Sequence, residues 1–73
     1  MNKSFYKTAE EIMDGGDPYG GIYSFSDFSN LKWKCIGYAL NGKVCFCRMA
    51  ERENGTFKQV NKYVNPEDEV IVW

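Results

Sequence analysis

Four segments from residue 31 onward are strand-like, and the first three alternate between hydrophobic and polar residues, as strands with one buried face do. They are "LKWKCIGYAL" (31–40), "KVCFCRMAE" (43–51), "TFKQVNKYV" (56–64) and "EVIVW" (69–73). Asn41-Gly42 lies between the first two segments and Asn54-Gly55 between the second and third. Asn-Gly favours the tight turns of β-hairpins, so the first three segments predict a β-meander. Pro66 cannot donate to a ladder and predicts a turn before the last segment.

The N-terminal residues follow a helical period instead. Apolar residues recur three to four positions apart at Phe5, Ala9, Ile12 and Met13. Thr8 and Glu11 have the spacing of a capping box, in which each side chain bonds the backbone N–H of the other residue. Gly15-Gly16 is a typical helix end. The pattern predicts a helix at about residues 5–14.

Residues 15–21, "GGDPYGG", predict a glycine-rich loop between this helix and the sheet. The following "GIYSFSDF" alternates weakly, and we expect it to form an irregular edge strand or an ordered loop. The chain therefore predicts one small α+β domain over residues 1–73. One short N-terminal helix packs on a three- to four-stranded antiparallel β-meander, and the sheet covers about residues 31–73.

Two-residue loops at both Asn-Gly sites would place Tyr38 opposite Cys45 and Met49 opposite Val60. Because side chains alternate along a strand, each face of the sheet then collects a defined set. We assign to the core the face with Ile36, Tyr38, Leu40, Cys45, Cys47, Met49, Val60 and Val64. The opposite face carries Trp33, Cys35, Val44, Phe46, Arg48, Phe57, Gln59, Asn61 and Tyr63. A bulge at either turn would exchange the faces of one strand.

The three cysteines are expected to be small buried hydrophobes. Cys45 and Cys47 lie two apart on one strand, where Cα atoms are roughly 6.5–7 Å apart, at or beyond the reach of an unstrained disulfide. Cys35 is expected on the other face. A zinc site needs about four nitrogen or sulfur ligands, and the chain has no histidine. We therefore expect no metal, no cofactor and no disulfide.

The absence of histidine also removes the usual general base and every Ser-His or Cys-His nucleophile pair. The acidic pairs have simpler explanations as a helix start, a turn or a solvated chain end. We expect no enzymatic activity. No apolar run approaches the about 18 residues of a membrane span, and we expect a cytoplasmic protein with no membrane association.

The face with interleaved aromatic and polar residues is the candidate site: Trp33, Phe46, Arg48, Phe57, Gln59, Asn61 and Tyr63. Aromatic side chains and arginine are enriched at the hot spots of protein interfaces. We expect non-catalytic binding of a protein partner, with acidic residues near both chain ends as flanks. Compact inhibitors that phages or mobile elements encode against host machinery belong to this class.

Three alternatives stay open. The same aromatic face could stack the bases of a single-stranded nucleic acid, although a net charge of −1 argues against a binder that follows phosphates. The terminal "EVIVW" could be an exposed edge strand that pairs two copies into a homodimer. Finally, residues 21–30 or 69–73 could cover the aromatic face, which would then be part of the protein's own core.

Overall fold

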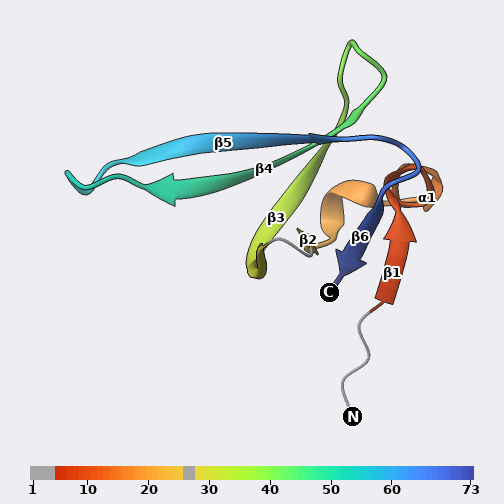
Figure 1. Ribbon diagram of the computed structural model, residues 1–73, viewed down its shortest axis with the longest axis horizontal. Helices are drawn as coiled ribbons and strands as arrows, with labels where there is room; N and C mark the ends of the chain where they lie inside the picture. The colour runs from red at the N-terminus through yellow and green to blue at the C-terminus, as the bar shows by residue number, and fades with distance from the viewer. Residues whose placement is uncertain (1–4, 26–27) are drawn as a thin grey trace.

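The computed structural model describes residues 5–25 and 28–73. Within these residues one antiparallel sheet of six strands carries a single short α-helix and one 3-10 turn (Figure 1). In chain order the elements are β1 (Phe5–Thr8), α1 (Ala9–Asp14), η1 (Pro18–Gly20), β2 (Tyr23–Phe25), β3 (Phe28–Tyr38), β4 (Val44–Glu51), β5 (Phe57–Val64) and β6 (Glu69–Val72). The small domain is mostly sheet, with two more strands than the upper limit of the sequence prediction.

The two additional strands, β1 and β2, flank the C-terminal strand β6. The order across the sheet is β1-β6-β2-β3-β4-β5, so β6 pairs with β1 on one side and with β2 on the other. The alternative in which "EVIVW" is an exposed edge strand is therefore wrong. Its backbone is occupied on both sides, and the described edges of the sheet are β1 and β5. The segment after Gly21 contributes β2, an interior strand rather than an edge.

The predicted helix begins four residues later than expected. Phe5–Thr8 is strand β1, paired antiparallel with β6, and only Ala9–Asp14 is helical. The capping box is confirmed: the backbone N–H of Thr8 donates to the Glu11 carboxylate at 2.8 Å, and that of Glu11 donates to the Thr8 hydroxyl at 3.2 Å. The first helical N–H groups, of Ala9 and Glu10, donate to the carbonyls of Asp68 and Pro66. The β5–β6 turn therefore fixes the start of the helix.

This cap gives a testable prediction for stability. Thr8→Ala should lower the free energy of unfolding by about 1 kcal/mol, as measured by urea denaturation at neutral pH, because one N–H of the first turn loses its acceptor. Thr8→Ser keeps the hydroxyl and should lose much less.

The hydrogen bond from the Thr8 backbone N–H holds the pKa of the Glu11 carboxyl below its ordinary value of 4.5. The Glu11 carboxylate therefore stabilises the fold fully above pH 4.5, and this stabilisation is lost as the carboxyl becomes protonated at lower pH. The difference in the free energy of unfolding between wild type and Glu11→Gln, measured by urea denaturation, should shrink as the pH falls below 4.5.

Both Asn-Gly sites form three-residue loops, not the predicted two-residue loops. In the first, Ala39 N–H donates to Lys43 O at 2.7 Å and Gly42 N–H donates to Ala39 O at 3.0 Å. The second loop, Glu53 to Gly55, has the same two bonds between Arg52, Thr56 and Gly55. Only the glycine of each loop has a positive φ, 82° at Gly42 and 84° at Gly55. This is a type I turn followed by a left-handed glycine, the common three-residue hairpin.

The longer loops shift the pairing by one residue. Cys45 pairs with Tyr63 and Met49 with Gln59, whereas the prediction paired Met49 with Val60. A one-residue shift exchanges the faces of a whole strand. Phe57, Gln59, Asn61 and Tyr63 consequently share a face with Cys45, Cys47 and Met49, and not with Phe46.

A β-bulge in β3 sets the pairing between β3 and β4. Cys35 pairs with Phe46 but Gly37 pairs with Cys45, which leaves Ile36 without an opposite residue. Gly37 has φ 111°, a backbone conformation that L-residues rarely adopt. The extra residue turns Trp33 and Cys35 toward the same side as Phe46. The predicted grouping of these three residues is confirmed, although the loop geometry assumed for it was wrong.

The predicted core face is also wrong. Phe46, Val44 and Val70 are completely buried, and the Trp33 and Cys35 side chains are buried beside them. Aromatic rings pack edge-to-face in this core, with centroids 5.2–5.6 Å apart. Phe46 contacts Tyr23 and Phe25, and Phe25 also contacts Trp33. The alternative in which residues from 21 onward cover this face is therefore confirmed for Tyr23 and Phe25. Aromatic rings fill the interior because each buries a large area in a short chain.

Most residues assigned to the core from the sequence lie outside it. Ile36, Tyr38 and Met49 are about half exposed, and Leu40 lies fully in solvent in the first hairpin loop. Cys47 is half-buried. Cys45 and Val64 are buried and Val60 packs against the core, so these three were placed correctly.

Candidate partner-binding surface

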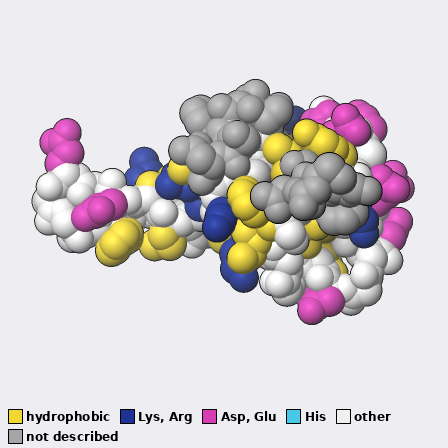
Figure 2. Space-filling view, turned by 90° about the horizontal axis from the view of Figure 1, so that it is seen from below, with side chains coloured by type: hydrophobic (Ala, Val, Ile, Leu, Met, Phe, Trp, Pro, Cys, Tyr) yellow, Lys and Arg dark blue, Asp and Glu magenta, His cyan; other side chains and the backbone are white. Residues whose placement is uncertain are grey.

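The outer half of the β4–β5 hairpin projects from the rest of the domain (Figure 1). Burial decreases along it, from the fully buried Val44 and Phe46 at the base to the exposed Glu51 and Phe57 at the outer end. We call residues 48–60 the arm. Figure 2 shows it extending away from the body, with acidic side chains at its tip and Lys and Arg side chains gathered where it joins the body.

One face of this hairpin exposes large apolar side chains. Phe57, Met49 and Tyr63 have 61%, 58% and 50% of their surface exposed. Because these residues alternate with those that face the core, they lie on the same side of the two paired strands. Gln59 and Asn61 are between them, and the Gln59 amide donates to the Asn61 carbonyl oxygen at 3.0 Å. Glu51, which pairs with Phe57, lies on the same side. This face continues from the arm onto the base of the hairpin, and we call it the arm face: Cys47, Met49, Glu51, Phe57, Gln59, Asn61 and Tyr63.

The structure thus divides the predicted site residues between two sides of the sheet. Trp33 and Phe46 are core residues and are not accessible to a partner. The Arg48 guanidinium lies over the Trp33 ring, 5.7 Å from its centroid, and is half-buried. Phe57, Gln59, Asn61 and Tyr63 are exposed together on the opposite side. A surface that includes all seven residues does not exist.

A groove lies at the root of the arm, where β4 and β3 separate. Their ladder ends at the pair Lys34–Cys47. If it continued, Trp33 would pair with Arg48 and Lys32 with Met49, but the two strands diverge instead (Figure 1). The resulting groove has a volume of about 550 Å³ and is lined by Leu31, Lys32, Lys34, Cys47, Arg48, Met49 and Gln59. We call it the notch.

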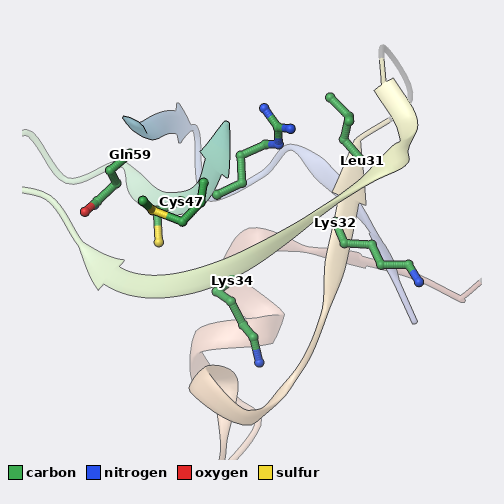
Figure 3. A pocket seen from close by; sticks show the side chains of 7 residues that line it. Leu31, Lys32, Lys34, Cys47 and Gln59 are labelled. Carbon is green, nitrogen blue, oxygen red and sulfur yellow. The ribbon is translucent and has the colours of Figure 1, made fainter. Parts of the chain in front are cut away.

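The notch has a distinct charge. Three of its seven lining residues, Lys32, Lys34 and Arg48, are cationic, and none of the other four is acidic. Figure 3 shows Lys34 and Cys47 pointing to one side of the strands and Leu31 pointing to the other, so side chains from both faces line the groove. The Lys32 amine lies over the Trp73 ring, 4.8 Å from its centroid. Both tryptophans of the chain are therefore in contact with a cation of the notch.

Two of the three cysteines, Cys35 and Cys45, are buried, and Cys47 is half-buried in the lining of the notch. Burial raises the pKa of the Cys35 thiol and of the Cys45 thiol, which makes both poor nucleophiles near neutral pH. The Cys35 sulfur lies 3.6 Å from the Met13 sulfur in the core. Across the described part of the chain, no three Cys, Asp or Glu side chains come together in a way that could hold a metal ion.

Sequence reasoning did not identify the notch. The alternation Leu31-Lys32-Trp33-Lys34 does indicate two lysines on one side of β3. What it does not indicate is the point at which β3 leaves β4, because this depends on the bulge at Ile36 and on the packing of Trp33 under Arg48.

Comparisons with protein-family models, with curated proteins and with solved structures gave no match. Among the residues described, no helix has the length and apolar character needed to cross a membrane.

Proposed function

We propose that the protein is a non-catalytic binding module that contacts a protein partner through the arm face. The observation that supports this most strongly is the exposure of Met49, Phe57 and Tyr63 on one side of a projecting hairpin. Isolated surface hydrophobes are common in soluble proteins, but grouped ones with an amide rim are typical of interaction sites. Phe57 and Tyr63 would be the anchors, and Gln59 and Asn61 would supply hydrogen bonds.

A protein partner is favoured over a single-stranded nucleic acid. Binders of single strands combine cations with aromatic rings on which bases stack. Of the three rings that lie under a cation, Trp33 and Phe25 are buried, and Trp73 is 62% exposed. The described residues therefore offer one exposed ring beside a cation, not the succession of rings that stacks several bases. The exposed rings Phe57 and Tyr63 lie on the arm face, whose one charged member, Glu51, is paired with Phe57 and would repel phosphates. Inhibition of a host protein, expected from the small size, stays a prediction within this proposal.

The test is capture of a partner with immobilised protein from a bacterial lysate, quantified by mass spectrometry. The double variant Phe57→Ala/Tyr63→Ala should lose at least about tenfold in recovery of a specific partner, since hot-spot truncations cost about 2 kcal/mol or more. Tyr6→Ala is the matched control, because Tyr6 is also 58% exposed but lies on β1 at the other edge of the sheet.

Circular dichroism of each variant should show an unchanged fold, since all three side chains are largely in solvent. Recovery that is the same for wild type, the double variant and Tyr6→Ala would contradict the proposal. A saturable response of tryptophan fluorescence to short oligonucleotides at low salt, lost in the double variant, would favour the nucleic-acid alternative instead.

A further inference from the structure

Strand β4 has an unused backbone edge in the arm. The N–H of Arg52 donates to Thr56 O, so Arg52 bonds toward β5. Residues of an antiparallel ladder bond alternately to one side and the other. Arg48 and Ala50 therefore also bond toward β5, whereas Met49 and Glu51 direct their N–H and C=O groups toward the side that β3 has left. No described strand pairs with them there.

This open edge begins at the notch. The last residue of β4 that β3 occupies is Cys47, and the next residue with outward backbone groups is Met49, which lines the groove. A strand from another molecule could therefore continue the sheet in the place where β3 would have been. Addition of a strand to an exposed sheet edge is a common mode of peptide recognition, in which main-chain hydrogen bonds give affinity and flanking side chains give specificity.

The side chains around this edge select for charge. Lys32, Lys34 and Arg48 surround the root of the groove without a carboxylate among the lining residues. Farther out the charges are mixed, with Glu51, Arg52 and Lys58 all exposed near the end of the hairpin. A bound segment would therefore meet cations without neighbouring acids at the root, and Glu51 at the outer end of β4.

We propose that the notch binds an extended acidic peptide segment, which adds to β4 as an antiparallel strand through Met49 and Glu51. This rests on the proposed protein-binding function and names the chemistry of the partner. Because β4 runs from root to tip, an antiparallel segment has its C-terminal half at the root. Its acidic residues therefore belong in that half, beside Lys32, Lys34 and Arg48, and away from Glu51.

A nucleic acid fits this groove less well than a peptide. The cations would attract phosphates, but none of the seven lining residues is aromatic, and the neighbouring exposed ring, Trp73 under Lys32, could stack one base and not a row of them. The paired N–H and C=O groups of Met49 and Glu51 also match a peptide backbone, which offers one acceptor and one donor per residue.

The experiment uses intrinsic tryptophan fluorescence, because the ring of each tryptophan is covered by a cation of the notch. The probe is the acetylated and amidated peptide Thr-Val-Thr-Val-Glu-Val-Glu, titrated at low ionic strength. We expect a saturable change that weakens as salt is added. The reversed sequence places its glutamates beside Glu51 and should bind more weakly. A peptide that is N-methylated at the alternate residues whose N–H groups would face β4 should also bind more weakly.

Charge variants test the site. Lys34→Glu should weaken binding at least about tenfold, because like charges replace an attractive contact. Lys7→Glu is the matched control: it makes the same change of charge on β1, away from the notch, and should bind as wild type does. Circular dichroism checks that both variants fold.

Several outcomes would overturn the proposal. These are no fluorescence change, equal binding of the N-methylated peptide, or an oligothymidine that binds more tightly than the peptide. Self-association in sedimentation that Lys34→Glu abolishes, without peptide binding, would assign the notch to a second copy of the chain. The capture experiment uses arm-face variants that leave Lys34 intact, so failure of the peptide titration and failure of the arm-face proposal are distinguishable.

Discussion

Phe46→Ala is expected to lower the free energy of unfolding by about 3–5 kcal/mol, the range for removing a buried phenylalanine ring. Phe46 is completely buried and contacts both Tyr23 and Phe25 edge-to-face. A domain of 73 residues has a total stability of roughly 4–11 kcal/mol, so the variant should retain little of it. Its melting temperature should fall by roughly 12–40 °C, measured by circular dichroism at 222 nm.

Phe57→Ala is the matched control for this change. The same ring is removed, but 61% of the Phe57 side chain is in solvent. We expect a change within about 0.5 kcal/mol, as for most surface substitutions. Equal losses for the two variants would mean that the two faces of the hairpin are assigned incorrectly, and the arm face would no longer be a free surface.

Gly37→Ala is expected to cost about 1–3 kcal/mol, because an L-residue at φ 111° is strained. The added Cβ would lie 3.5 Å from the Tyr19 hydroxyl, an ordinary contact, so the cost comes from the backbone and not from crowding. Urea denaturation at neutral pH gives the difference from wild type.

Ile36→Ala serves as the control at the neighbouring position. Its side chain is 48% exposed, and we expect a loss below about 1 kcal/mol. If Gly37→Ala were as stable as wild type, the bulge would not be present in solution. Trp33 and Cys35 would then have no reason to face the same side as Phe46.

The fold could be predicted in part from local signals. The capping box of Thr8 and Glu11, the helix end at Gly15 and the meander from Leu31 to Val64 all depend on neighbouring residues, and all are present. The strand at Phe5–Thr8 could not be read from this pattern. Its short apolar period also fits a helix, and only pairing with the distant β6 decides between the two.

The candidate site was less predictable, because it depends on strand register. One residue more in each loop and one bulge decide which side chains reach solvent. Four of the seven proposed contact residues, Phe57, Gln59, Asn61 and Tyr63, are exposed together. Trp33 and Phe46 are buried instead. Aromatic residues can fill a small core or form a binding surface, and the sequence looks the same in both cases.

Amide hydrogen exchange along β4, followed residue by residue by NMR, tests the central claim that an open backbone edge receives an acidic strand. In the free protein, the N–H groups of Met49 and Glu51 should exchange faster than those of Arg48 and Ala50, which bond to β5. Saturation with the acidic peptide should slow exchange at Met49 and Glu51 while Arg48 and Ala50 change little. Protection that appears only on β5, or an exchange pattern that the peptide does not alter, would contradict it.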